Sequence, residues 1–191
     1  IAGFEMPTSG EILLNGEDIS QLPANKRPIN TVFQRYALFP HMNIYDNIAF
    51  GLKLKKLPKE EIRKKVKRVL DIVDLEGFEN RKISTLSGGQ QQRICIARAL
   101  AVQPEVLLMD EPSRGIDIGA KTEVFEIIHD LAEKGLSIIV ISSELKEIMA
   151  IADRIVVLSN GKKTGELTGD EITEDTLVRT SYAGLGTGRN A

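Results

Sequence analysis

Three short apolar runs, separated by segments with helical spacing, constrain the fold of this chain more than any other feature of its sequence. EVLLMD at residues 105–110 is almost wholly apolar, and SIIVIS at 137–142 and RIVVLS at 154–159 follow it. A strand covered on both faces by helices has such a continuous apolar sequence. Between the first two runs, residues 119–134 place their apolar side chains on one helical face, and Gly135 follows as a C-terminal cap. The alternation predicts an α/β fold with a largely parallel sheet.

A mostly helical stretch, residues 36–100, interrupts this alternation and predicts an inserted helical subdomain. Within it, KEEIRKKVKRVLDIVDL carries one apolar face at spacings of three and four residues, made of Ile62, Val66, Val69, Leu70 and Val73. Two Asn-Gly pairs, at residues 15–16 and 160–161, predict tight turns between strands. We expect one domain over residues 1–180 and a disordered, glycine-rich tail over 181–191.

Composition excludes several classes of protein. The 191 residues carry 25 basic and 27 acidic side chains, so there is no global positive field to bind nucleic acid. A single cysteine, Cys95, excludes a disulfide framework and a cysteine-based metal cluster, and its apolar surroundings predict a buried core thiol. The apolar runs are far shorter than the roughly 18 residues of a membrane helix, and no signal peptide precedes them, so we expect a cytoplasmic protein.

LSGGQQQR, residues 86–93, predicts an anion site at the start of a helix. A serine hydroxyl and glycine amides in a first helical turn face the positive end of the helix dipole, and glycine lets a ligand approach the backbone closely. The sequence contains no G-x-x-x-x-G-K-[ST], the loop that usually cradles a nucleotide's phosphates. The phosphate held at LSGGQ therefore has to be presented by something else.

Asp110 and Glu111 lie side by side at the end of an apolar run. A carboxylate there is suited to hold Mg²⁺, directly or through water, and its neighbour to polarise an attacking water. Adjacent carboxylates are common, so their order in the chain matters more: Gln34 after an expected strand, then LSGGQ, then Asp-Glu, then Gly-Ile-Asp.

This ordered set resembles the ATP-binding cassette (ABC) ATPases, from Ile1 to about Val178, and implies the P-loop NTPase-like fold of that family. The resemblance implies that Gln34 contacts the metal and the water, that Asp110 and Glu111 are the Walker B pair, and that Asp117 ends a loop that communicates between two cassettes. It assigns the signature loop to Leu86, Ser87, Gly88, Gly89 and Gln90. It also implies ATP and Mg²⁺ as cofactors and a second cassette, identical or different, whose ATP the signature loop grips.

The further partners that the resemblance implies are transmembrane permease subunits and, indirectly, a solute-binding protein. They would place the chain peripherally on the inner face of the cell membrane. The family's phosphate loop lies upstream of a segment like IAGFEMPTSG, so the chain resembles an N-terminally truncated cassette that is inactive alone. Where the family has a switch histidine, this sequence has Ser143, for which we weigh a catalytic role against the N-cap of the following helix.

The two halves resemble different relatives. VFQRYALFPHMNIYDNIAFGL to LSGGQQQRICIARAL is similar to ATPases of polyamine, iron and maltose-type importers, whereas SRGIDIGAK to RIVVL is similar to the second cassette of monosaccharide importers. Because of the second half, we expect an importer of a monosaccharide, with a polyamine, iron or maltose-type importer as the alternative. Two other interpretations are an inactive module that only completes a partner's ATP site and a soluble ABC protein acting on DNA or ribosomes. The last predicts heptads or basic patches that the sequence lacks.

Overall fold

The computed structural model describes residues 1–33 and 37–183, and these form two compact units, residues 1–141 and 142–183. The first unit begins with a hairpin of β1 (Leu13–Leu14) and β2 (Glu17–Asp18), followed by a 3₁₀ turn (Ala24–Lys26). Asn15 and Gly16 both have positive φ, 50° and 85°, as a two-residue turn of this type requires. The predicted Asn-Gly hairpin is confirmed.

A parallel sheet organises the rest of the first unit. It contains β3 (Ile29–Val32), β4 (Val106–Asp110) and β5 (Ser137–Ile141) in the order β3-β4-β5, and α4 (Ile118–Glu133) connects β4 to β5. Central β4 is buried, with Leu107 and Met109 fully covered. The predicted α/β fold with a parallel sheet is confirmed.

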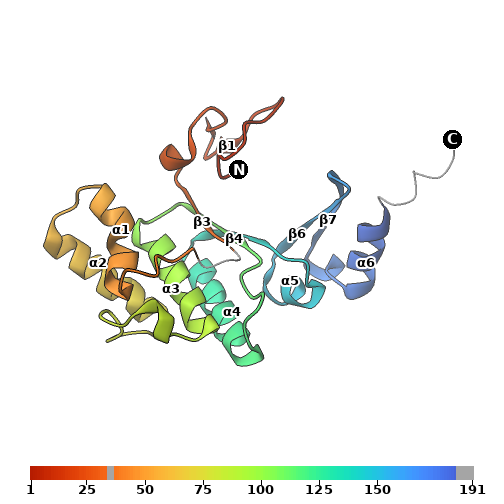
Figure 1. The fold of residues 1–191 in the computed structure, drawn as a ribbon. Helices are drawn as coiled ribbons and strands as arrows, with labels where there is room; N and C mark the ends of the chain where they lie inside the picture. Colours follow the sequence, from red (N-terminus) through yellow and green to blue (C-terminus); the bar gives the residue numbers. More distant parts are fainter. Residues whose placement is uncertain (34–36, 184–191) are drawn as a thin grey trace. The chain divides into compact units, whose positions relative to one another are not determined.

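Helices α1 (Ile44–Leu54), α2 (Lys59–Ile72) and α3 (Gly88–Ala101) pack on one another between β3 and β4 in the sequence (Figure 1). A 3₁₀ turn, Ile83–Thr85, leads into α3. The apolar face predicted for α2 is buried, and so is Cys95 on α3. The division of the chain into domain and subdomain stays a prediction.

The strand SIIVIS differs from its predicted burial. Alternate residues of β5 are exposed, Ile139 by 37% and Ile141 by 49%, so the face of the strand to which they point is not covered. An apolar run therefore marks this strand correctly but does not show how many of its faces are covered.

The second unit contains α5 (Leu145–Ile151), β6 (Arg154–Ser159), β7 (Lys162–Thr168), a 3₁₀ turn (Gly169–Glu171) and α6 (Glu174–Tyr182). β6 pairs antiparallel with β7, because the two-residue Asn-Gly turn between them returns the chain beside itself. It does not belong to the parallel sheet of β3, β4 and β5. Ile155, Val157, Leu167 and Leu177 form the core of this unit. Ser181 and Tyr182, expected in the tail, belong to α6.

Candidate nucleotide site

The LSGGQ segment forms the start of α3, as the sequence predicts. Ser87 is the N-cap: its Oγ accepts a hydrogen bond from the Gln90 N–H at 3.2 Å, and the Gln90 Oε1 accepts one from the Ser87 N–H at 3.1 Å. This reciprocal capping box fixes the first turn. Buried Leu86 anchors the chain just before the turn, whereas Ser87 is exposed and Gly88 is half-buried. Because first-turn amides have no intrahelical acceptor, Gly88 and Gly89 supply the N–H groups that an anion needs.

Asp117 caps the next helix in the same manner. Its Oδ1 accepts a hydrogen bond from the Ala120 N–H at 3.0 Å, which starts α4 at Ile118. The first turns of α3 and α4 touch, because a Cβ built on Gly89 would lie 2.3 Å from the Ala120 Cβ. The structure thus brings together two predicted groups, the signature residues and Asp117, at two adjacent helix starts.

Asp110 and Glu111 end the central strand of the sheet. Asp110 is the last residue of β4 and is half-buried, opposite Ile141 of β5. Glu111 follows with φ of 48°, a left-handed conformation that non-glycine residues seldom adopt and that is often found at functional sites. Both carboxylates are therefore held at the carboxyl edge of a parallel sheet, where ligands of such folds bind.

The acidic groups fit a magnesium ion that is bound mainly by its nucleotide. Among residues 1–33 and 37–183, no three histidine, cysteine or acidic side chains gather as a metal site. Mg²⁺ usually keeps several waters and takes only one or two protein carboxylates beside substrate phosphates. Asp110 alone is sufficient for that kind of coordination.

Two predicted residues are not brought into this arrangement. Gln34 lies outside the described residues. Ser143 is exposed in the second unit, and it is not the N-cap of α5, because that helix begins at Leu145 with Glu144 at the cap position. The Oγ of the preceding Ser142 accepts the Glu144 N–H at 3.1 Å, which forms a turn ahead of α5 and does not cap the helix. The catalytic role of Ser143 stays a prediction.

Asn47 is a structural residue that the sequence analysis missed. Its side chain is fully buried on α1, and its Oδ1 accepts the Phe39 N–H at 2.8 Å. Its Nδ2 donates to the carbonyls of Phe39, at 3.1 Å, and Asn43, at 2.9 Å. The segment before α1 is also held by Arg98, which donates to the Ala37 carbonyl at 2.7 Å. The apolar run IAF that follows Asn47 in α1 was the available signal, because an amide buried beside such a run needs partners.

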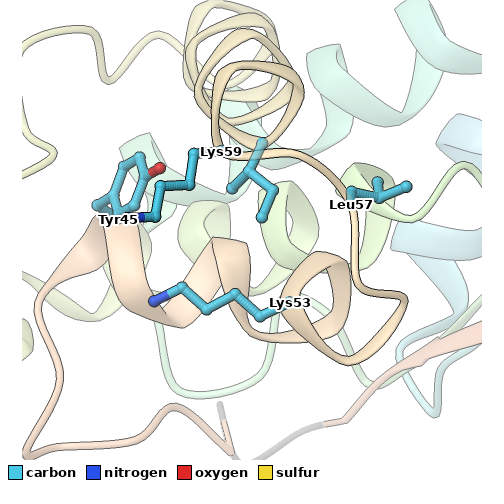
Figure 2. Close-up of a pocket in the computed structure, with 5 residues that line it drawn as sticks. Tyr45, Lys53, Leu57 and Lys59 are labelled. Atoms are coloured by element: carbon cyan, nitrogen blue, oxygen red, sulfur yellow. The ribbon is translucent and has the colours of Figure 1, made fainter.

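A shallow hollow of about 460 Å³ lies between α1 and α2 (Figure 2). It is lined by Tyr45, Lys53, Leu57, Lys59 and Ile62. Lys53 donates to Asp46 at 2.6 Å, so its charge is already paired. The hollow includes none of the residues predicted to bind nucleotide.

Comparisons with known proteins agree with these features. The family profile described as "ABC transporter" matches residues 1–114. The spermidine/putrescine import ATP-binding protein PotA of Clostridium novyi (strain NT) is 50% identical over 163 residues, which are 85% of this chain and 47% of that protein. The protein of the same name from Bacteroides fragilis (strain YCH46) is 48% identical, over 85% of this chain and 35% of its own length. This chain therefore spans half or less of these two relatives.

Solved structures of ATP-binding cassettes have the same fold. CbiO1 from Clostridium perfringens, part of an ABC transporter complex, is 28% identical with a TM-score of 0.83, over 95% of this chain and 75% of that one. A dimeric ATP-binding cassette in a post-hydrolysis state with ADP and Pi is 29% identical with a TM-score of 0.75, over 88% of this chain and 77% of that one. No helix among the described residues is long and apolar enough to cross a membrane.

Proposed function

This chain belongs to the ABC transporter family, and we propose that it is the ATP-binding and ATP-hydrolysing part of a polyamine importer. The observation that carries the proposal is the pair of capped helix starts: the LSGGQ turn, with its exposed Ser87 cap, lies beside the Asp117 turn in the same unit as the Asp110–Glu111 strand end. Amides aimed outward from such a turn are suited to a phosphate presented by another chain.

The residues divide the work of hydrolysis between two chains. Asp110 holds Mg²⁺ and Glu111 polarises the attacking water at this chain's own edge of the sheet. Gln34 and Ser143 are proposed to complete that site. Leu86 to Gln90 and Asp117 serve the ATP of a second cassette, whose γ-phosphate meets the bare amides of Gly88 and Gly89.

The second cassette has a candidate contact on the α4 start. Ile118, next to Asp117, exposes 84% of its side chain, more than any other large apolar residue described here. We expect Ile118→Asn to weaken association with a second cassette, because it removes apolar area that association would bury. Sedimentation in the presence of nucleotide tests this, with Val178→Asn, a change at a half-exposed apolar residue of α6, as the control.

A permease partner is proposed for the segment before α1. The rings of Phe39 and Phe50 pack at a tilt of 47° with their centroids 4.7 Å apart, and Phe50 is 36% exposed although it is aromatic. Aromatic side chains on a rigid surface are typical of protein contacts. Attachment there would hold the chain peripherally at a membrane.

We propose a polyamine as the cargo, and not the monosaccharide that we expected from the second half of the sequence. The relatives that are about half identical are named as spermidine/putrescine import proteins, and they match over 85% of this chain, whereas sugar import has no support in these comparisons. A cassette reports its cargo only through kinship, because it contacts the membrane subunit and not the solute.

Transport assays test the proposal. Cells that lack the gene should lose uptake of labelled spermidine and putrescine and keep uptake of labelled ribose. The wild-type gene should restore polyamine uptake, and the Glu111→Gln gene should not. Loss of ribose uptake alone would overturn the cargo assignment, and restoration by Glu111→Gln would overturn the hydrolytic role.

A second candidate is a non-hydrolysing module that only completes a partner's ATP site, for which the two adjacent capped helix starts would suffice without the Asp110–Glu111 strand end. Restored uptake by Glu111→Gln together with failure of a Gly88→Asp gene would favour this second function.

A further inference from the structure

Gly89 of α3 lies directly against Ala120 of α4. A Cβ at position 89 would lie 2.3 Å from the Ala120 Cβ and 3.5 Å from its Cα, so only glycine fits there without moving a helix. Both residues lie in first turns, Gly89 two residues after the Ser87 cap and Ala120 three residues after the Asp117 cap. The contact therefore sets the spacing of the two capped turns directly.

One turn further along, an ion pair joins the same two helices. Arg93 Nη2 lies 3.3 Å from Glu123 Oε2, and Arg93 is nearly buried. Arg93 Nη1 also donates to the Val73 carbonyl at the end of α2, at 3.1 Å. The guanidinium thus cannot swing away freely, and it holds α4 against α3 while the small Gly89–Ala120 contact determines how close they come.

We propose that Ala120 is a positioning residue, which acts through Gly89 to set how the LSGGQ turn and the Asp117 turn are presented together to a partner's nucleotide. The inference rests on the proposed function, because it assigns both turns to the same partner site. A methyl group added on either side would push the turns apart and misplace the amides of Gly88 and Gly89. A displacement of about 1 Å in a pre-organised site is enough to lose a large part of its activity.

A size-swap cycle tests this. Gly89→Ala, Ala120→Gly and the double variant are each paired with a complete cassette whose own signature loop is inactivated, so that turnover reports only the site completed by this chain. Gly89→Ala should lower kcat at least tenfold and leave the KM for ATP within about twofold, because the partner's own phosphate loop makes the first contact with ATP. The double variant, which moves the methyl group from one helix to the other, should recover most of kcat.

Ala120→Val serves as a second variant, since it overfills the contact from the α4 side and should resemble Gly89→Ala. Thermal unfolding of the wild type, the two single swap variants and the double variant, without nucleotide, should show the same rescue in Tm. If the double variant is folded but stays as slow as Gly89→Ala, the positioning role is wrong and the glycine is needed for access of the phosphate itself. If Tm shows no rescue, the contact does not set the spacing.

The two proposals fail differently. If Ser87→Ala leaves the turnover of the mixed dimer at the wild-type level, the shared nucleotide site is contradicted. The Tm values of the swap variants would then still show whether the Gly89–Ala120 contact sets the spacing of α3 and α4.

Discussion

The Glu111 N–H donates a hydrogen bond to the Ile141 carbonyl at 2.8 Å, one residue past the last paired residue of β4. This bond fixes the backbone of the proposed catalytic carboxylate to the end of β5 although its φ is 48°. A strained position that neighbouring strands hold in place is typical of a residue placed for chemistry.

Glu111→Gln should remove hydrolysis and leave nucleotide binding. The amide keeps the shape of the side chain but cannot act as a general base, a role worth about 10²–10⁴-fold in rate. We expect the effect in a fusion that places a G-x-x-x-x-G-K-[ST] phosphate-loop segment ahead of Ile1, where ATP binding is measured by calorimetry and turnover by phosphate release. The unfused 191-residue chain should show negligible turnover.

Glu126→Gln, on an exposed position of α4, is the matched control. Steady turnover by the unfused chain, or by the fused Glu111→Gln protein, would contradict this assignment. A fusion without ATP affinity would show instead that the rest of the site does not accept the loop.

Asn47→Ala should lower the free energy of unfolding more than the loss of a single helix cap does. The change leaves the Phe39 N–H and several carbonyls without their partner, and each unsatisfied buried group costs about 1–3 kcal/mol. We expect the free energy of unfolding in urea to fall by about 2–4 kcal/mol. Asn43→Ala, which removes only the N-cap bond of α1, is the comparison and should cost about 1 kcal/mol. An equal or smaller loss for Asn47→Ala would contradict the clamp.

Local sequence rules predicted the parts of this structure that depend on near neighbours. The helix start at LSGGQ, the Asn-Gly turns and the apolar face of α2 each follow from residues within a few positions of one another. The parallel pairing of β4 and β5 also followed, because strand and helix alternate there.

Contacts between distant segments could not be predicted in this way. Nothing in the sequence places Gly89 against Ala120, and β6 pairs with β7 although its apolar run looks like that of β4. Helix α5 starts at Leu145 with Glu144 and not Ser143 at the cap position, because the helix start depends on a backbone turn that a Ser-Ser pair leaves open. The edge position of β5 likewise depends on which strands lie beside it.

Cys95 should react with thiol reagents only when the protein opens. Burial raises the pKa of its thiol to about 12, so the reactive thiolate is scarce at pH 8. A folded-state pKa raised from 9.0 means that this group stabilises the protein fully below pH 9 and that the contribution is lost as the pH rises toward 12. We expect slow modification in buffer, fast modification in denaturant, and a Cys95→Ala protein whose stability depends less on pH above 9. Rapid labelling of the folded protein would contradict the burial of this thiol.

Gly88→Asp should stop the turnover of a complete partner cassette. The aspartate adds a side chain and a negative charge at the half-buried first residue of α3, where the partner's γ-phosphate is proposed to meet amide groups. The carboxylate and the phosphate are both negative, and like charges that lie close together repel strongly in a site that excludes water. ATP binding by the partner should change little, because its own phosphate loop supplies the first contacts. Turnover should therefore fall at least a hundredfold in a mixed dimer of demonstrated composition, and Ala132→Asp, an equal charge on an exposed residue of α4, should leave it unchanged. Full turnover with Gly88→Asp in that dimer would remove the assignment of LSGGQ to a partner's phosphate.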